Sequence, residues 1–147
     1  MKAPFLLGRL LLGGFFLYSG IHHFQQRKTL SQYAAQKNVP LPDAAVLATG
    51  ALLVTGGASI LLGVKPKMGT LAILGFLAGV SPIMHDFWKS QDPSERQNQM
   101  INFMRNMALL GRTLALMGID EPWPVSIPFG QPTALDHIRR FAREVAA

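Results

Sequence analysis

Two long stretches without any charged side chain constrain this sequence more than any other feature. Residues Ala44–Gly63 form an uncharged run of twenty residues, and residues Met68–Met84 form a second run of seventeen. A helix needs about 20 mainly apolar residues, with a range of roughly 17–25, to cross the hydrocarbon core of a bilayer. A buried helix of a soluble protein rarely lacks a polar face over such a length. The two runs therefore predict membrane-spanning helices.

Two further apolar segments complete the expected bundle, whose four spans are residues 4–24, 44–63, 68–87 and 100–118. The first segment is too long for a signal peptide, and it ends in His22, His23 and Phe24 instead of small residues, so we expect it to be retained. The short turn at 64–67 makes the second and third spans antiparallel neighbours. The predicted fold class is all-α: a polytopic membrane protein with four transmembrane helices in a bundle.

The tail, residues 119–147, carries a second pattern. A helix is predicted over about 134–145, with apolar residues on one face and Arg139, Arg140 and Arg143 on the other. Such a basic amphipathic helix lies on a membrane surface, with Trp123 and Phe129 as interfacial anchors. An ordinary soluble surface helix is the equal alternative.

The side of the membrane follows from the basic residues. Four spans place both termini on one side, which carries Lys2, Lys65, Lys67, Arg139, Arg140 and Arg143. The opposite side carries Arg27, Lys28, Lys37, Lys89 and Arg96. Because basic residues are enriched in cytoplasmic loops, this small excess favours cytoplasmic termini. The same residues lie in short turns and in the tail, which suits anionic lipid headgroups and argues against a nucleic-acid partner.

Glycines are frequent in the expected spans, and Gly75 with Gly79 forms a GxxxG motif. Small residues let helix backbones approach closely in lipid. We interpret them as packing positions inside one compact bundle, in preference to a dedicated dimer face.

The fourth expected span carries polar residues on one helical face: Asn102, Arg105, Asn106, Arg112 and Thr113. An arginine at mid-bilayer costs about 2.5–3.5 kcal/mol on insertion scales. This face is therefore expected to meet protein, trapped water or headgroups. Arg112, together with Arg9 in the first span, is predicted to contact lipid phosphates or another anion.

Polar residues of three spans are expected near one membrane surface. The candidate polar pocket consists of His23, His85, Asp86, Arg105 and Asn106. Asp86 is the carboxylate best placed to neutralise Arg105, so we predict that these two residues pair.

Three interpretations of the histidines stay open. They lie at headgroup level without a ligand, or they form a site for a polar or quinone-like ligand. In a weaker alternative, His22, His23 and His85 ligate a metal or haem. Haem is disfavoured because no CxxCH motif is present, and no cofactor is predicted. The absence of cysteine excludes thiolate metal sites and thiol–disulfide chemistry. There is also no GxSxG, P-loop, GxGxxG or HExxH motif.

The order and spacing of several short pieces resemble the DoxX family of small four-helix membrane proteins. The pieces are GRLLLGGFFLYSGIHHF, Tyr33, VPLP, GGASILLGVKPK, MHDFWK and INFMRNMALLG, within about residues 5–118. The last piece is similar to a family pattern F-x-K-N-x-x-x-x-G, with Arg105 replacing the lysine. The sequence departs from the family in two places. The second span has no acidic residue in GALLVTGG, where family members often carry one, and His22-His23 stands where a lysine is common.

The resemblance implies a multi-pass protein of the bacterial cytoplasmic (inner) membrane, with the lipid bilayer and other membrane or redox subunits as partners. Some relatives are subunits of thiosulfate:quinone oxidoreductase, and others act in an oxidative-stress complex. We expect an accessory or scaffold subunit of a membrane assembly without chemistry of its own. The alternatives are a subunit of a quinone-linked oxidoreductase, or a small-solute permease.

Overall fold

The computed structural model describes residues 2–127, which are helical over most of their length. The elements are α1 (Lys2–Gln25), α2 (Arg27–Gln36), α3 (Pro42–Leu62), α4 (Pro66–Met84), the 3-10 turn η1 (Phe87–Lys89) and α5 (Pro93–Met117). No strand occurs in this part of the chain. The predicted C-terminal helix at 134–145, its three arginines and Phe129 lie outside the described residues.

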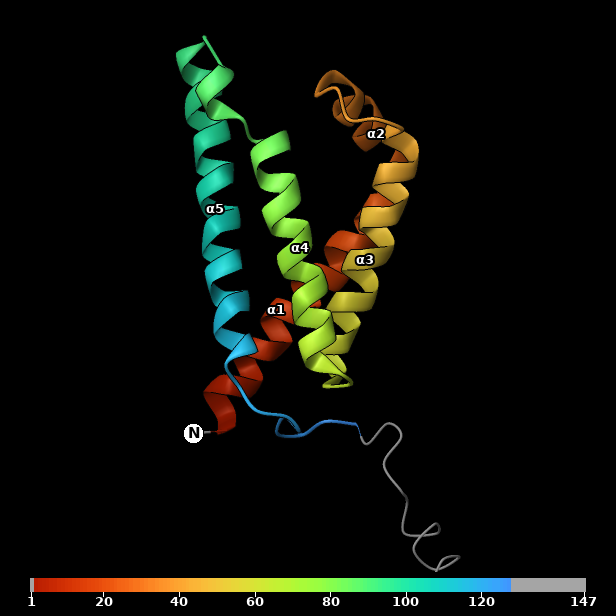
Figure 1. The fold of residues 1–147 in the computed structure, drawn as a ribbon, viewed down its shortest axis with the longest axis vertical. Helices are drawn as coiled ribbons and strands as arrows, with labels where there is room; N and C mark the ends of the chain where they lie inside the picture. Colours follow the sequence, from red (N-terminus) through yellow and green to blue (C-terminus); the bar gives the residue numbers. More distant parts are fainter. Residues whose placement is uncertain (1, 128–147) are drawn as a thin grey trace, which may run out of the picture.

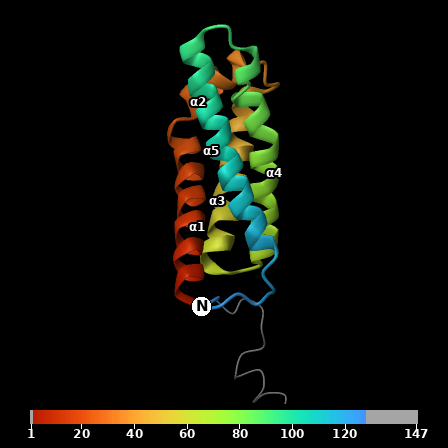
Figure 2. The same ribbon diagram turned by 90° about the vertical axis from the view of Figure 1, so that its left-hand side faces the viewer.

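Four long helices run side by side along the length of the molecule (Figures 1 and 2). The N-terminus, the α3–α4 turn and the segment after α5 lie at one end, here called the lower end. The short helix α2 lies at the upper end beside α3. Within residues 2–127, three helical segments are long and apolar enough to cross a membrane, namely Ala3–Gln25, Pro42–Leu62 and Pro66–Lys89. The all-α fold is confirmed, while α5 is a long helix outside that set.

The helix boundaries differ from the expected spans at the upper end. The expected third span continued to residue 87, but α4 ends at Met84, and the chain makes a short 3-10 turn before α5. The expected fourth span started at residue 100, whereas α5 begins at Pro93, seven residues earlier. Asp92 caps this helix, because its carboxylate accepts a hydrogen bond of 2.7 Å from the Glu95 N–H. Because the first turns of α5 are polar, the pattern of apolar residues does not indicate that the helix starts here.

Helices α1 and α3 make the most extensive contact in the bundle, and glycines let their backbones approach closely. A Cβ atom added to Gly57 would lie 2.5 Å from the backbone nitrogen of Leu17, and one added to Gly20 would lie 2.6 Å from that of Val54. No other residue type fits where two helix backbones approach so closely. The packing interpretation is correct for these glycines.

The GxxxG motif of α4 does not follow that interpretation. A Cβ added to Gly75 or Gly79 would meet no atom within 4 Å, and both residues are exposed. Gly111 on α5 is open in the same way. These glycines face away from the described bundle, so the prediction that the motif packs inside it is wrong.

The segment after α5, residues 119–127, closes the lower end of the bundle, and we call it the strap. Trp123 is only 2% exposed and packs edge-on against Phe5 of α1, with ring centroids 5.5 Å apart. The N–H of Ile127 donates a hydrogen bond of 3.0 Å to the carbonyl of Leu62 at the end of α3. Trp123 is therefore a core residue, and its predicted role as an interfacial anchor is wrong.

Candidate functional site

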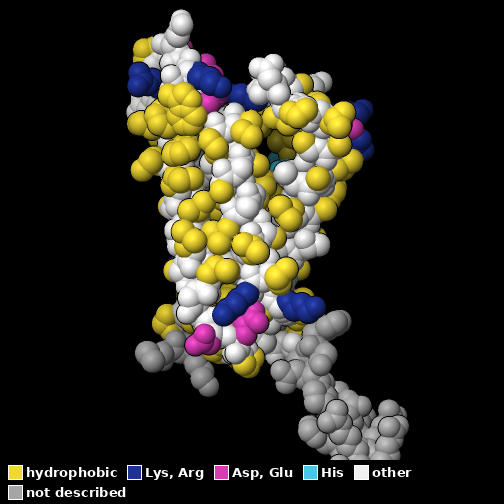
Figure 3. Space-filling view, in the orientation of Figure 1, with side chains coloured by type: hydrophobic (Ala, Val, Ile, Leu, Met, Phe, Trp, Pro, Cys, Tyr) yellow, Lys and Arg dark blue, Asp and Glu magenta, His cyan; other side chains and the backbone are white. Residues whose placement is uncertain are grey.

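Three adjoining cavities cross the upper half of the bundle. The middle chamber, of about 270 Å³, is lined by residues of α1 to α5, and His23, His85 and Asn106 are among them. The inner chamber, of about 170 Å³, extends between α2, α3 and α4 and shares His23 with the middle chamber. Figure 3 shows a hollow in this part of the surface with a histidine inside it.

The outer groove, of about 710 Å³, opens between α1 and α5. It shares His85 and Asn106 with the middle chamber and is also lined by Arg105 and Arg112. Four of the five predicted pocket residues therefore surround two connected cavities, whose remaining walls are mostly apolar.

The fifth residue, Asp86, lies elsewhere, and the predicted pair with Arg105 is wrong. Asp86 forms ion pairs with Lys37, at 2.5 Å, and with Lys89, at 3.3 Å. Arg105 takes part in none of the ion pairs among the described residues, and its side chain is exposed. The early start of α5 explains the error, because it places Arg105 about 18 Å along the helix from Pro93.

The contact with Asp86 comes from the segment that follows α2. The side chains of Lys37 and Asp86 are 18% and 12% exposed, so their ion pair is largely shielded. The hydrogen bond to Asp86 raises the pKa of the Lys37 ammonium above its ordinary value. Both residues line a polar cavity of about 340 Å³ together with Asp92 and Glu95, at the upper end of the bundle. This cavity is lined by charged and polar side chains, and it shares no lining residue with the inner or the middle chamber.

A chain of hydrogen bonds holds His85 in place. Tyr33 donates its hydroxyl proton to the carbonyl of Met84, at 3.2 Å. The side-chain NH₂ of Gln99 donates to the Tyr33 oxygen, also at 3.2 Å. The Gln99 carbonyl oxygen then lies 2.9 Å from Nδ1 of His85. Residues of α2, α4 and α5 are thereby joined at the upper wall of the middle chamber.

The two neighbouring histidines of α1 have different environments. Nδ1 of His23 lies 2.7 Å from the backbone carbonyl of Ser19, and the ring lines both chambers. His22 is exposed and stacks against Tyr18. The described residues hold no group of three side chains that fits a metal ion. The alternative in which His22, His23 and His85 ligate a metal is therefore wrong, because successive residues of a helix point in different directions.

The two arginines expected to contact an anion also differ. Arg9 is 3% exposed and donates hydrogen bonds of 2.8 Å and 2.7 Å to the carbonyls of Pro124 and Val125 in the strap. It therefore fastens the strap to α1 and does not reach lipid. Arg112 is exposed, and its guanidinium lies over Gly8, where an added Cβ would be 1.7 Å from Nη2. Its contact with an anion stays a prediction.

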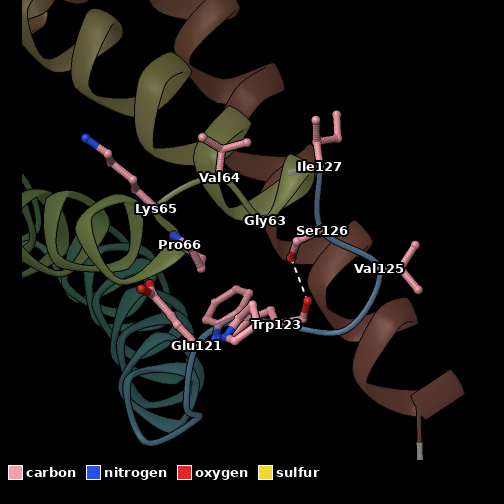
Figure 4. A pocket seen from close by; sticks show the side chains of 10 residues that line it. Gly63, Val64, Lys65, Pro66, Glu121, Trp123, Val125, Ser126 and Ile127 are labelled. Atoms are coloured by element: carbon pink, nitrogen blue, oxygen red, sulfur yellow. Dashed lines mark hydrogen bonds between the residues drawn. The ribbon is translucent and has the colours of Figure 1, made fainter. Parts of the chain in front are cut away.

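A further cleft, of about 620 Å³, lies at the lower end between the α3–α4 turn and the strap (Figure 4). Glu121 closes one side of it, because its carboxylate accepts a hydrogen bond of 2.9 Å from the Lys67 N–H. The Ser126 hydroxyl donates to the Trp123 carbonyl, at 2.7 Å. The cleft is lined by turn and strap residues that hold each other in place, and none of the predicted site residues lies in it.

Three polar residues at the upper end of the bundle, two of them beside the middle chamber, were missed from the sequence. Tyr33, Gln99 and Lys37 lie in segments that read as polar connections outside the expected spans. Their contacts depend on α2 folding back over the bundle and on the early start of α5. The available signals were the aromatic ring of Tyr33 within a polar connection and the place of Tyr33 among the pieces that resemble the DoxX family.

The sequence model of the DoxX family matches residues 5–86. This match covers α1 to α4 with most of the polar residues around the middle chamber, and it leaves α5 outside. Neither the curated proteins nor the solved structures provide a significant match. Because the matched residues make up more than half of the chain and contain most of the three apolar spans found among the described residues, the protein is a membrane protein that belongs to the DoxX family.

Proposed function

We propose that the protein is an accessory subunit of an assembly in a bacterial cytoplasmic membrane, with four spans and cytoplasmic termini. In this proposal α5 is the fourth span. From Met100 to Met117 it extends about 27 Å, close to the thickness of the hydrocarbon core. Its polar turns before Met100 then project beyond the membrane.

The topology is testable because the chain contains no cysteine. Single cysteines replace Gln91, above α5, and Asp120, below it. An impermeant maleimide applied to sealed, right-side-out vesicles should label the cysteine at 91 and leave the one at 120 unlabelled until the vesicles are opened. Labelling of both residues from the same side would show that α5 does not cross.

The observation that carries the accessory role is the outward face of α5. Ala108, Gly111 and Ala115 form a row of small, exposed residues along the helix. Arg105 and Arg112 flank this row and are also exposed. Small residues favour close contact between helices in lipid, and a buried arginine needs an anionic partner. The occupant with matching chemistry is a membrane helix of another subunit that carries a carboxylate.

Photo-crosslinking in native membranes tests this role. A photoreactive amino acid at Ala108 should yield one discrete adduct with a different protein, and Arg105→Gln should weaken that adduct several-fold. The matched control carries the same group at Leu11, which is 66% exposed on α1. An adduct with a second copy of the chain, or with lipid alone, would contradict the proposal.

A second candidate function, a subunit of a quinone-linked oxidoreductase, is favoured by the middle chamber. Its mostly apolar walls and its few polar groups, His23, His85 and Asn106, match the usual character of a site for a lipid-soluble ligand. Replacing His85 or Arg105 by alanine should then abolish quinone reduction by the assembly while the protein stays folded and inserted. Unchanged turnover in both variants would exclude this function.

A further inference from the structure

The hydrogen bonds of the two chamber histidines determine which of their nitrogens carries the proton. A backbone carbonyl oxygen only accepts hydrogen bonds, so Nδ1 of His23 donates its proton to the carbonyl of Ser19. In a neutral imidazole with a proton on Nδ1, Nε2 is an acceptor. His23 therefore offers a lone pair at Nε2.

The proton of His85 is fixed through two intermediate residues, Gln99 and Tyr33. The carbonyl of Met84 can only accept, so the Tyr33 hydroxyl donates to it and accepts from Gln99. The amide NH₂ of Gln99 is thus turned toward Tyr33, and its carbonyl oxygen toward His85. Because this oxygen accepts, Nδ1 of His85 is the donor, and Nε2 of His85 is again an acceptor.

Within residues 2–127, the Nε2 atoms of His23 and His85 are neither paired nor sealed from solvent. Neither has a hydrogen-bond partner among the described residues. In the same part of the chain, the side-chain atom that is both sealed from solvent and unpaired is Nε of Arg9. The unpaired Nε2 atoms of His23 and His85 are therefore not sealed.

The two rings also flank the middle chamber. His23 borders the inner chamber and His85 borders the outer groove, so a molecule in the middle chamber has one imidazole toward each neighbouring cavity. The hydroxyl of Ser19 and the amide of Asn106 can each donate or accept, so they do not select between ligands. The Tyr33 hydroxyl donates its proton to the Met84 carbonyl, so this proton is not available to a ligand.

We propose that the middle chamber binds a lipid-soluble aromatic diol through its hydroxyl groups, and that it selects this reduced form over the corresponding quinone. Each hydroxyl donates to an imidazole Nε2, whereas a quinone carbonyl facing the same atom would place two acceptors together. This inference rests on the ligand site of the second candidate function and adds its selectivity. It is independent of the role of α5.

Anaerobic equilibrium binding to the purified full-length protein in nanodiscs tests the selectivity. The probes are a decyl-chain 1,4-benzohydroquinone and the corresponding benzoquinone. Two added hydrogen bonds predict that the hydroquinone binds at least about tenfold more tightly. That factor corresponds to a rise of about 30 mV in the midpoint potential of the bound couple. His23→Phe and His85→Phe should each reduce the preference by about threefold or more, while His22→Phe leaves it unchanged.

The results distinguish a failure of the selectivity from a failure of the ligand site itself. Equal binding of both probes, or tighter binding of the quinone, overturns the selectivity and leaves a ligand site in place. Binding of neither probe overturns both. A readout without any ligand is the ¹⁵N spectrum of the two imidazoles, which should show the proton on Nδ1 in both rings. A proton on Nε2 of either ring would contradict the proposal.

Discussion

Gly13, Gly20, Gly50 and Gly57 lie in close helix contacts between α1 and α3, and Gly69 lies in one between α4 and α3, whereas Gly75 and Gly79 of α4 and Gly111 of α5 face outward. At Gly57 an added methyl group would overlap the backbone of α1, but at Gly79 it would meet no atom within 4 Å. On the α5 side, the outer groove separates α1 from α5, and the strap joins them at the lower end. One residue type therefore serves two purposes, a rigid contact within the bundle and an open outward face.

The largest effect on the free energy of unfolding is expected at Trp123, where the strap joins α5 to α1. Trp123→Ala removes a buried indole from the contact with Phe5 and should lower the free energy of unfolding by about 3–5 kcal/mol. The measurement is equilibrium unfolding in detergent. Trp88→Ala is the matched control, because Trp88 is 51% exposed, and its loss should stay near 1 kcal/mol or below. Equal losses of stability in the two variants would show that the strap does not hold α1 and α5 together.

A smaller effect separates the closed glycines from the open ones. Gly57→Ala places a methyl group 2.5 Å from the backbone nitrogen of Leu17, so the two helices must move apart. We expect a loss of about 1–3 kcal/mol, measured as above. Gly79→Ala should be neutral or slightly stabilising, by up to about 1 kcal/mol, since alanine favours helix. A loss at Gly79 of the same size would mean that this face is covered in the folded protein.

The smallest effect concerns the ion pair at the upper end. The pKa of Lys37 is raised in the folded state, so its stabilising contribution is fully present below the unfolded value of about 10.4. It is lost as the pH rises through the higher folded value. We expect about 1 kcal/mol to disappear across this range, measured by unfolding at increasing pH. Lys37→Met should remove this alkaline loss, and Lys28→Met, at an exposed position, should retain it.

Much of the fold could be predicted because lipid leaves few choices. Runs of about 20 mainly apolar residues must form helices to satisfy their backbone groups. Three such helices are present among residues 2–127, within a few residues of the expected limits. The start of α5 was missed because its first turns are polar. That shift moved Gln99, and not Arg105, to the side of His85.

The candidate site could be predicted only in part. His23, His85 and Asn106 were placed together because their depths follow from helix length and direction. The partner of Asp86 could not be predicted, since Lys37 reaches it only after α2 folds back at the upper end. Nothing in the sequence indicated that Arg9, unlike Arg112, donates hydrogen bonds to the strap carbonyls and does not reach lipid.

The sequence by itself determined the membrane environment of this protein and its helical class, because transfer into lipid depends on local composition along each segment. Only the tertiary structure decided which charges pair, which glycines lie in close contacts, and which nitrogens of His23 and His85 are without a partner among the described residues. These properties depend on contacts between residues far apart in the chain. A hydrogen-bond acceptor at Nε2 of His85 exists because Gln99 and Tyr33, sixty-six residues apart, meet beside it.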